Sequence, residues 1–181
     1  MGSKNWREVR TILWLLPVIF FIHDSEELLT MPVWIATHQN ELNQIASTNK
    51  SIAEIIHSLP STTPQIAIAI GSILILFIVV TTGAFFSNGK GLWFYAYNCL
   101  LGVLFLHVFT HLAQTIIFAG YTPGVVGAVI AVIPGSLYIY YRLFKSEFLT
   151  VKTAVICAVI GFVLFVPGAL LAQQIGKVLA G

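Results

Sequence analysis

Four long apolar segments constrain the fold of this chain more than any other feature. They cover about residues 65–86, 92–119, 123–141 and 152–175. A helix needs about 20 mostly apolar residues to cross a bilayer, and each segment is long enough. Of the 181 residues, 57% are hydrophobic and 9% charged, against roughly 25% charged in a soluble domain. The sequence therefore predicts an all-α, polytopic membrane protein.

A further apolar segment near the N-terminus is interrupted by ionisable residues. Residues 11–22 alone are too short to cross, and no small-residue cleavage site follows them as it would in a signal peptide. The segment reaches a spanning length only if its helix continues through His23-Asp24-Ser25-Glu26-Glu27 to about Trp34. We therefore expect a single domain, residues 1–181, with five transmembrane helices, the first over about residues 11–34.

The distribution of lysine and arginine predicts the orientation of this bundle. With the N-terminus inside, the outer side carries only Lys50 and Lys177. The inner side then carries seven basic residues: Lys4, Arg7, Arg10, Lys90, Arg142, Lys145 and Lys152. This bias follows the positive-inside rule. We expect an integral protein of a bacterial plasma membrane, with a cytoplasmic N-terminus and an outer C-terminus.

The only long connection between the expected spans covers about residues 35–63, on the outer side. Four of its apolar residues recur at helical spacing: Ile52, Ile55, Ile56 and Leu59. This pattern predicts a short amphipathic helix lying on or over the outer face, although a surface loop with some helix fits as well. His38 and His57 in this connection are expected to face solvent.

The ionisable residues of the first helix fall mostly on one face. On a helical wheel with about 100° per residue, Glu27 lies about 40° to one side of His23 and Glu26 about 60° to the other. These three side chains can converge on a point. Asp24 lies about 100° from His23, so we expect it near the outer interface or hydrogen-bonded to one of the converging groups.

Acidic residues at this depth need a compensating partner. Each one costs about 2.5–3.5 kcal/mol on insertion scales, and no lysine or arginine lies within an apolar segment at their depth. Protonated carboxyl groups, histidine partners or a bound cation would each offset that cost.

The segment over 92–119 carries a polar stripe that matches these acids in depth. His107 and His111 are four residues apart, and Thr110 and Gln114 share their face. At 1.5 Å per residue, His23 lies about 18 Å from the inner end of its helix and His107 about 22 Å from the inner end of its own. Both stripes are therefore expected in the outer half of the membrane, facing the bundle interior.

Together the two stripes offer imidazole and carboxylate groups at spacings that chelate metals. The predicted ligands are His23, Glu26, Glu27, His107 and His111. Nitrogen and carboxylate ligands suit a divalent transition metal, zinc ahead of iron. A metal-free acid–base site and a purely structural polar network remain alternatives. Thr110 and Gln114 either support ligands or join helices.

A turn over residues 120–124 connects two of the expected spans on the outer side. Gly120 suits the end of one helix and Pro123 the first turn of the next. The Tyr121 hydroxyl is then expected just above the polar site, as a lid or substrate contact, or else as an interface anchor.

These motifs resemble a known family of membrane proteins. His23-Asp24-Ser25-Glu26-Glu27 is similar to the His-x-x-Glu-Glu signature of the HXXEE proteins, and Tyr121-Thr122-Pro123-Gly124 to their Tyr-x-Pro-Gly motif. His107 or His111 would supply the further histidine of that family. The resemblance covers about residues 11–145. It implies a shared site at these positions but no reaction, because the family is functionally uncharacterised.

The residues themselves favour a membrane-embedded, metal-dependent enzyme. Glu27 would act as ligand or general base, with Glu26 and Tyr121 as further catalytic candidates. At this depth the site is open to the bilayer, so we expect hydrolysis or rearrangement of a small lipid or isoprenoid substrate, with membrane lipid as a partner.

Two other classes remain open from the sequence: a metal-free lipid isomerase and a small transporter of protons, metal or solute. The net charge of +2 and the lack of a basic patch with interleaved aromatic residues speak against nucleic acid.

Overall fold

The computed structural model describes residues 5–58 and 62–180, which are helical apart from short turns and contain no strand. The elements in chain order are α1 (Trp6–Val9), the 3-10 turn η1 (Arg10–Trp14), α2 (Leu15–Thr37), α3 (Gln39–Ala46), α4 (Lys50–Ser58), α5 (Thr63–Phe86), α6 (Gly91–Ile117), α7 (Val125–Gly127), the π-helical turn η2 (Ala128–Val132), α8 (Ile133–Lys145) and α9 (Val151–Ala180). The last three elements before α9 form one continuous run, Val125–Lys145. The all-α prediction is confirmed.

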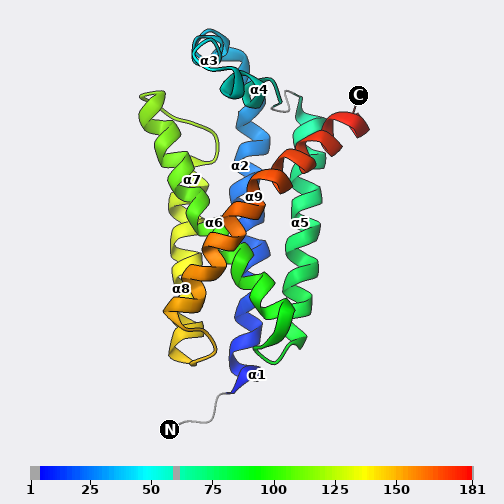
Figure 1. The fold of residues 1–181 in the computed structure, drawn as a ribbon, viewed down its shortest axis with the longest axis vertical. Coiled ribbons are helices and arrows are strands. Elements are labelled where there is room, and N and C mark those ends of the chain that lie inside the picture. The colour runs from blue at the N-terminus through cyan, green and yellow to red at the C-terminus, as the bar shows by residue number, and fades with distance from the viewer. Residues whose placement is uncertain (1–4, 59–61, 181) are drawn as a thin grey trace.

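The long helices stand side by side in a bundle (Figure 1). α2 rises from the N-terminal end at the bottom, and α3 and α4 lie together across the top. α9 packs against both α5 and α6, and α2 packs against α5 and the run of α7, η2 and α8. As a result, the faces of α2 and α6 that carry the polar stripes both lie inside the bundle.

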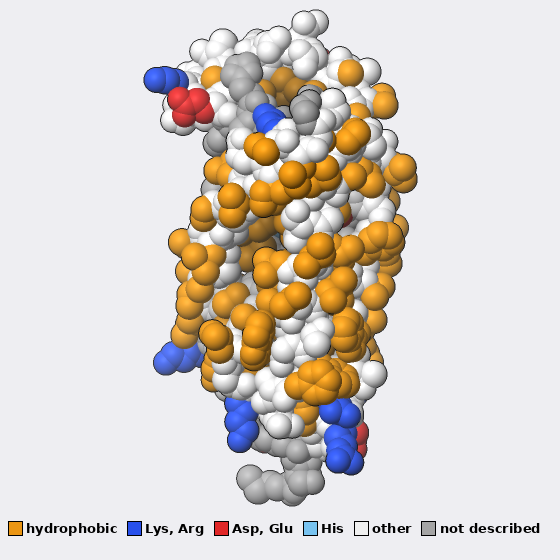
Figure 2. Space-filling model, turned by 90° about the vertical axis from the view of Figure 1, so that its right-hand side faces the viewer, with side chains coloured by type: hydrophobic (Ala, Val, Ile, Leu, Met, Phe, Trp, Pro, Cys, Tyr) orange, Lys and Arg blue, Asp and Glu red, His pale blue; other side chains and the backbone are white. Residues whose placement is uncertain are grey.

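Four helices are long and apolar enough to cross a membrane: α5, α6, the run Val125–Lys145 and α9. Exposed hydrophobic side chains cover most of the height of the face shown in Figure 2, and Lys and Arg side chains gather at its lower end. These four helices give the chain the character of a membrane protein. α2 has 23 residues, but it carries three acids and is not among the four.

A hydrogen bond near Pro17 joins α6 to the 3-10 turn that leads into α2. Pro17 has no backbone N–H, so the carbonyl of Leu13, four residues earlier, loses its usual helical donor. The Tyr97 hydroxyl of α6 donates to that carbonyl over 3.1 Å, and both side chains are completely buried. Leu13 of η1 and Tyr97 of α6 therefore meet within the hydrophobic core.

Small residues bring α6 and α9 into close contact. A methyl group added at Gly102 would come within 2.5 Å of the Ala158 backbone. Helices in membranes commonly associate through such small residues, because backbones can then approach closely.

The connection between α2 and α5 contains two helices, where the sequence predicts one at most. α4 covers the predicted amphipathic segment, while Leu59 lies outside the described residues. α3 has eight residues, mostly polar, with Leu42 as its buried side chain. A helix this short is marginal alone, so its packing against the bundle stabilises it.

The sequence predicts that both histidines of this connection face solvent, and the structure describes the side chain of one of them. His38, expected in solvent, is partly buried and stacks on Trp34 with ring centroids 4.3 Å apart. The side chain of His57 is outside the described residues.

Candidate metal centre

Four of the five predicted ligands meet between α2 and α6. One ligand atom from each of His23, Glu27, His107 and His111 can be chosen so that all lie within 4.8 Å of one another. His23 and Glu27 are four residues apart on α2, and the two histidines of α6 have the same spacing. Side chains at i and i+4 share a helix face, so each helix contributes two donor groups.

The spacing of these atoms is close to that of a metal site. A tetrahedral ion with bonds of about 2.0–2.1 Å holds its ligand atoms about 3.3 Å apart. His111 Nε2 lies 3.3 Å from Glu27 Oε1 and 2.9 Å from His107 Nε2. His23 Nε2 lies 4.0 Å from the same Glu27 oxygen. Small side-chain rotations would complete the coordination.

Burial leaves several imidazole nitrogens of this cluster without partners. His23 is 1% exposed and His111 2%. Both ring nitrogens of His23 and Nδ1 of His111 make no hydrogen bond within the described part of the chain. Buried polar atoms are nearly always paired, so a metal would fit as the missing partner of one ring nitrogen of His23, whereas the His111 atom that faces the other donors is Nε2.

Thr110 orients the His107 ring. Its hydroxyl donates to the His107 backbone carbonyl over 2.7 Å, and its oxygen lies 2.9 Å from His107 Nδ1. Because the single hydroxyl proton is already donated, Nδ1–H must be the donor to Thr110. His107 Nε2 is then left with a lone pair directed toward the cluster, as a metal ligand requires.

Glu26, the fifth predicted ligand, is placed elsewhere. Its carboxylate accepts hydrogen bonds from the backbone N–H groups of Val126 and Gly127 and from the Tyr121 hydroxyl, the last at 2.7 Å. The two N–H groups belong to the first turn of the run Val125–Lys145, which has no helical acceptors for them. Glu26 thus caps a neighbouring helix, whose N-terminal dipole also favours its negative charge.

Tyr121 joins the turn to α2 without touching the four clustered ligands. Its hydroxyl contacts Glu26 and lies 3.2 Å from Thr30 Oγ1, and its backbone carbonyl accepts from Trp34 Nε1 over 2.9 Å. Partial burial raises the pKa of Tyr121, so the phenol remains a neutral donor.

Two glycines allow this turn to approach the cluster. Gly124 has a φ of +87°, and a methyl group there would lie 2.5 Å from His111 Cε1 and 2.8 Å from Glu27 Oε1. At Gly127 the added carbon would lie 2.9 Å from the His23 Cα atom. The glycine of the Tyr-x-Pro-Gly motif therefore serves both the backbone conformation and the contact with the ligands.

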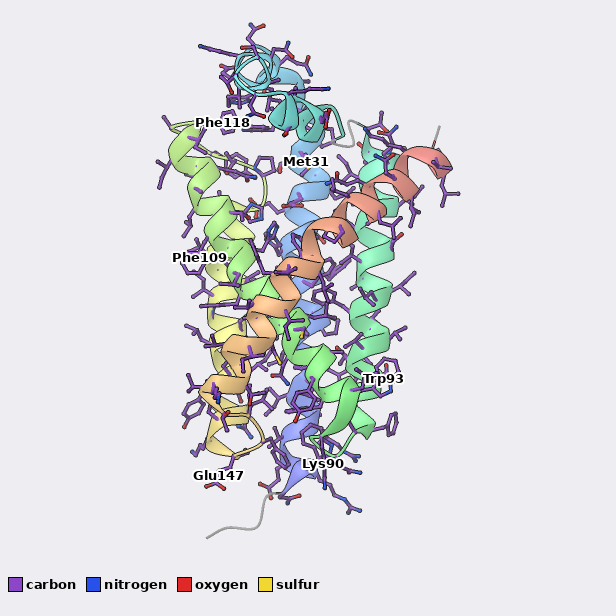
Figure 3. All side chains as sticks on the ribbon, in the orientation of Figure 1. Met31, Lys90, Trp93, Phe109, Phe118 and Glu147 are labelled. Atoms are coloured by element: carbon purple, nitrogen blue, oxygen red, sulfur yellow. The ribbon has the colours of Figure 1, made fainter. Side chains whose placement is uncertain are left out.

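A cavity of about 450 Å³ lies beside the cluster. Glu27, His107 and His111 form part of its wall, and most of the remaining lining is apolar. Met31 and Phe118, which Figure 3 labels in the upper half of the bundle, belong to this lining. Leu42 of α3 and Ile56 of α4 also reach it, so the connection between α2 and α5 forms part of the cavity wall.

Four polar residues of the described chain lie on the cavity wall apart from the cluster: Asp24, Gln114, Thr122 and Gln173. Asp24 is 7% exposed, and both Gln114 and Gln173 reach the lining. Sequence reasoning did not single out Gln173 of α9 or Gly127. The Gln173-Gln174 pair within an otherwise apolar segment, and the three-residue spacing of Gly124 and Gly127, were the available signals.

Comparison with curated proteins and with solved structures finds no match to this chain. A family model described as a protein of unknown function with HXXEE motif matches residues 14–139, more than half of the sequence. The match contains the four clustered ligands, Glu26 and the Tyr-x-Pro-Gly turn. On this evidence the chain belongs to the HXXEE-motif family.

Proposed function

We propose that this protein is a membrane-embedded, metal-dependent enzyme that hydrolyses or rearranges a lipid or isoprenoid substrate. The observation that carries the proposal is the convergence of three imidazoles and one carboxylate beside a mostly apolar cavity of about 450 Å³, with Glu27, His107 and His111 forming part of its wall. A cavity of this size and lining suits a small lipidic molecule.

The four clustered residues have two different roles in the proposed centre. His23, His107 and His111 hold the ion through ring nitrogens, and zinc suits this set better than iron. Once bound, such an ion polarises a water molecule or a carbonyl oxygen. Glu27 offsets part of the positive charge and lines the cavity, so it is the group placed to accept a proton from the reacting molecule.

Glu26 and Tyr121 support the centre without belonging to it. Glu26 anchors the start of the run Val125–Lys145, and Tyr121 fastens the preceding turn to α2. Both contacts hold Gly124 against His111 and Glu27. The role proposed for this pair is therefore positioning.

The proposal includes α2 as a fifth transmembrane helix, with the N-terminus inside. Two facts reduce the cost of its acids: Glu26 is paired with backbone N–H groups, and Glu27 lies among histidines. We expect a membrane-impermeant maleimide to label Ser47→Cys on intact cells and Asn5→Cys only after permeabilisation. Labelling of both positions from outside would mean that α2 does not cross.

The metal content of the purified protein tests the proposed function. After extraction in mild detergent without chelators, we expect close to one transition-metal ion per chain. X-ray absorption of that ion should show nitrogen and oxygen ligands without sulfur. A metal content below one-tenth of the protein concentration, after supplementation of the growth medium with zinc and iron, would reject the proposal.

A further inference from the structure

Of the three acids in the His-Asp-Ser-Glu-Glu segment, Asp24 is the one with a buried carboxyl oxygen that lacks a hydrogen-bond partner among the described residues. Glu26 accepts three hydrogen bonds, and Glu27 lies among the histidines. The Oδ2 atom of Asp24 is buried and has no hydrogen-bond partner among the described residues. A buried carboxyl oxygen without a partner is costly, so something outside the chain is expected to complete it.

The side chain of Asp24 lines the same cavity as the metal centre. Gln173 of α9 lines it as well, and its Oε1 atom is also buried without a partner in the described part of the chain. Two residues that each carry a buried acceptor oxygen without a partner among the described residues therefore lie on the wall of an otherwise mostly apolar space. A ligand that satisfies them must bring O–H or N–H donors.

The charges of the residues that line the cavity restrict the class of ligand further. Among the described residues that line it, none is lysine or arginine. An anionic head would be attracted to the proposed metal ion, but a phosphate or carboxylate placed against Asp24 itself would be repelled, with no basic side chain among the described lining residues to offset that repulsion. An uncharged or cationic head avoids that repulsion.

We propose that Asp24 is a substrate-binding residue that accepts a hydrogen bond from the hydroxyl or amino group of a single-chain lipid held in this cavity. The assignment rests on the proposed function, since it names the substrate class of the same site. Gln173 provides a second acceptor, and the apolar lining holds the chain of the lipid.

The helical register places this group close to the centre. Asp24 and Glu27 are three residues apart on α2, a spacing that puts their Cβ atoms about 5–6 Å from each other. A hydroxyl or amino group bound by Asp24 therefore lies only a few bonds from the part of the lipid that faces Glu27 and the histidines. The hydrogen bond from the lipid's hydroxyl or amino group to Asp24 thus places the neighbouring bond of the lipid beside the metal centre.

Binding of three matched probes tests this inference. The purified full-length protein in nanodiscs is titrated with 1-dodecanol, dodecylamine and dodecyl methyl ether, which has no donor, and bound adducts are counted by native mass spectrometry. We expect the alcohol and the amine to bind about tenfold or more tightly than the ether, as one buried hydrogen bond to a carboxyl group predicts.

Variants assign the preference to Asp24. Asp24→Leu should remove the preference for the alcohol and the amine and leave the affinity for the ether unchanged. If the Asp24→Leu variant does not fold, Asp24→Asn takes its place, because it keeps the size of the side chain. The Asp24→Asn variant should bind the amine more weakly than the wild type does. Ser25→Ala is the matched control on the same helical turn, because its hydroxyl bonds to the Phe21 carbonyl of its own helix.

The metal content of the same preparations separates this inference from the proposed function. A metal-loaded wild type that binds all three probes equally, or an Asp24→Leu variant that keeps the preference, would overturn the role of Asp24 alone. A wild type that lacks metal yet prefers the alcohol and the amine would confirm the ligand class and overturn the metalloenzyme.

Discussion

Replacing His111 with glutamine is expected to lower the affinity of the centre for zinc by more than about 100-fold. Loss of a group that merely orients a ligand costs roughly 10–100-fold in metal affinity, and His111 is itself a proposed ligand. Its Nε2 atom lies nearest both to Glu27 and to His107, so no neighbouring group can replace it. Titration against a competing chelator measures the change.

Two further variants provide comparisons for this result: one is expected to weaken zinc binding less than His111→Gln, and the other not at all. Thr110→Val removes the hydroxyl that orients His107 and should weaken zinc binding by about 10–100-fold. His38→Ala removes an imidazole that stacks on Trp34 outside the cluster and should leave zinc affinity unchanged. Zinc binding by His111→Gln at wild-type affinity would show that the four side chains do not form a metal site.

Gly124→Ala is expected to destroy the centre although it removes no ligand. The added methyl group would lie 2.5 Å from His111 Cε1 and 2.8 Å from Glu27 Oε1, closer than van der Waals contact allows. The φ of +87° adds strain of about 1–2 kcal/mol for any residue with a Cβ atom. We therefore expect loss of stoichiometric metal and a lower Tm.

Gly71→Ala provides the matched control for this substitution. Gly71 lies within α5, and a methyl group there has no atom within 4 Å. Alanine in a helix interior is favoured over glycine by about 1 kcal/mol, so Tm should stay constant or rise and the metal content should not change. A Gly124→Ala protein with the metal content and Tm of the Gly71→Ala protein would contradict the proposed packing of the turn against the ligands.

The cluster of His23, Glu27, His107 and His111 could be predicted because the spacing within each pair is a local property. His23 with Glu27, and His107 with His111, are each four residues apart, which places each pair on one face of its helix. Counting residues from the inner end of each helix then predicts that the two pairs lie at the same depth. The apolar segments likewise predict the helical bundle, because length and hydropathy are read directly from the chain.

Other features depend on which helices become neighbours. The helical wheel places Glu26 and Glu27 on either side of His23, so it cannot distinguish a ligand from a cap. The start of the run Val125–Lys145 packs against the Glu26 side of α2, and its N–H groups bind that carboxylate, while His111 of α6 reaches the Glu27 carboxylate. Asp24, for which an interface position or a hydrogen bond was expected, instead lines the cavity, and its Oδ2 atom has no hydrogen-bond partner among the described residues.

The sequence by itself therefore determined the all-helical bundle and the residues available for a site, since hydropathy and helical periodicity act within single segments. Only the tertiary structure decided that Glu26 caps a helix, that Asp24 and Gln173 share a cavity, and that Gly124 touches His111. Each of these outcomes depends on contacts between residues distant in the chain, and packing between helices, rather than any local pattern, selects them.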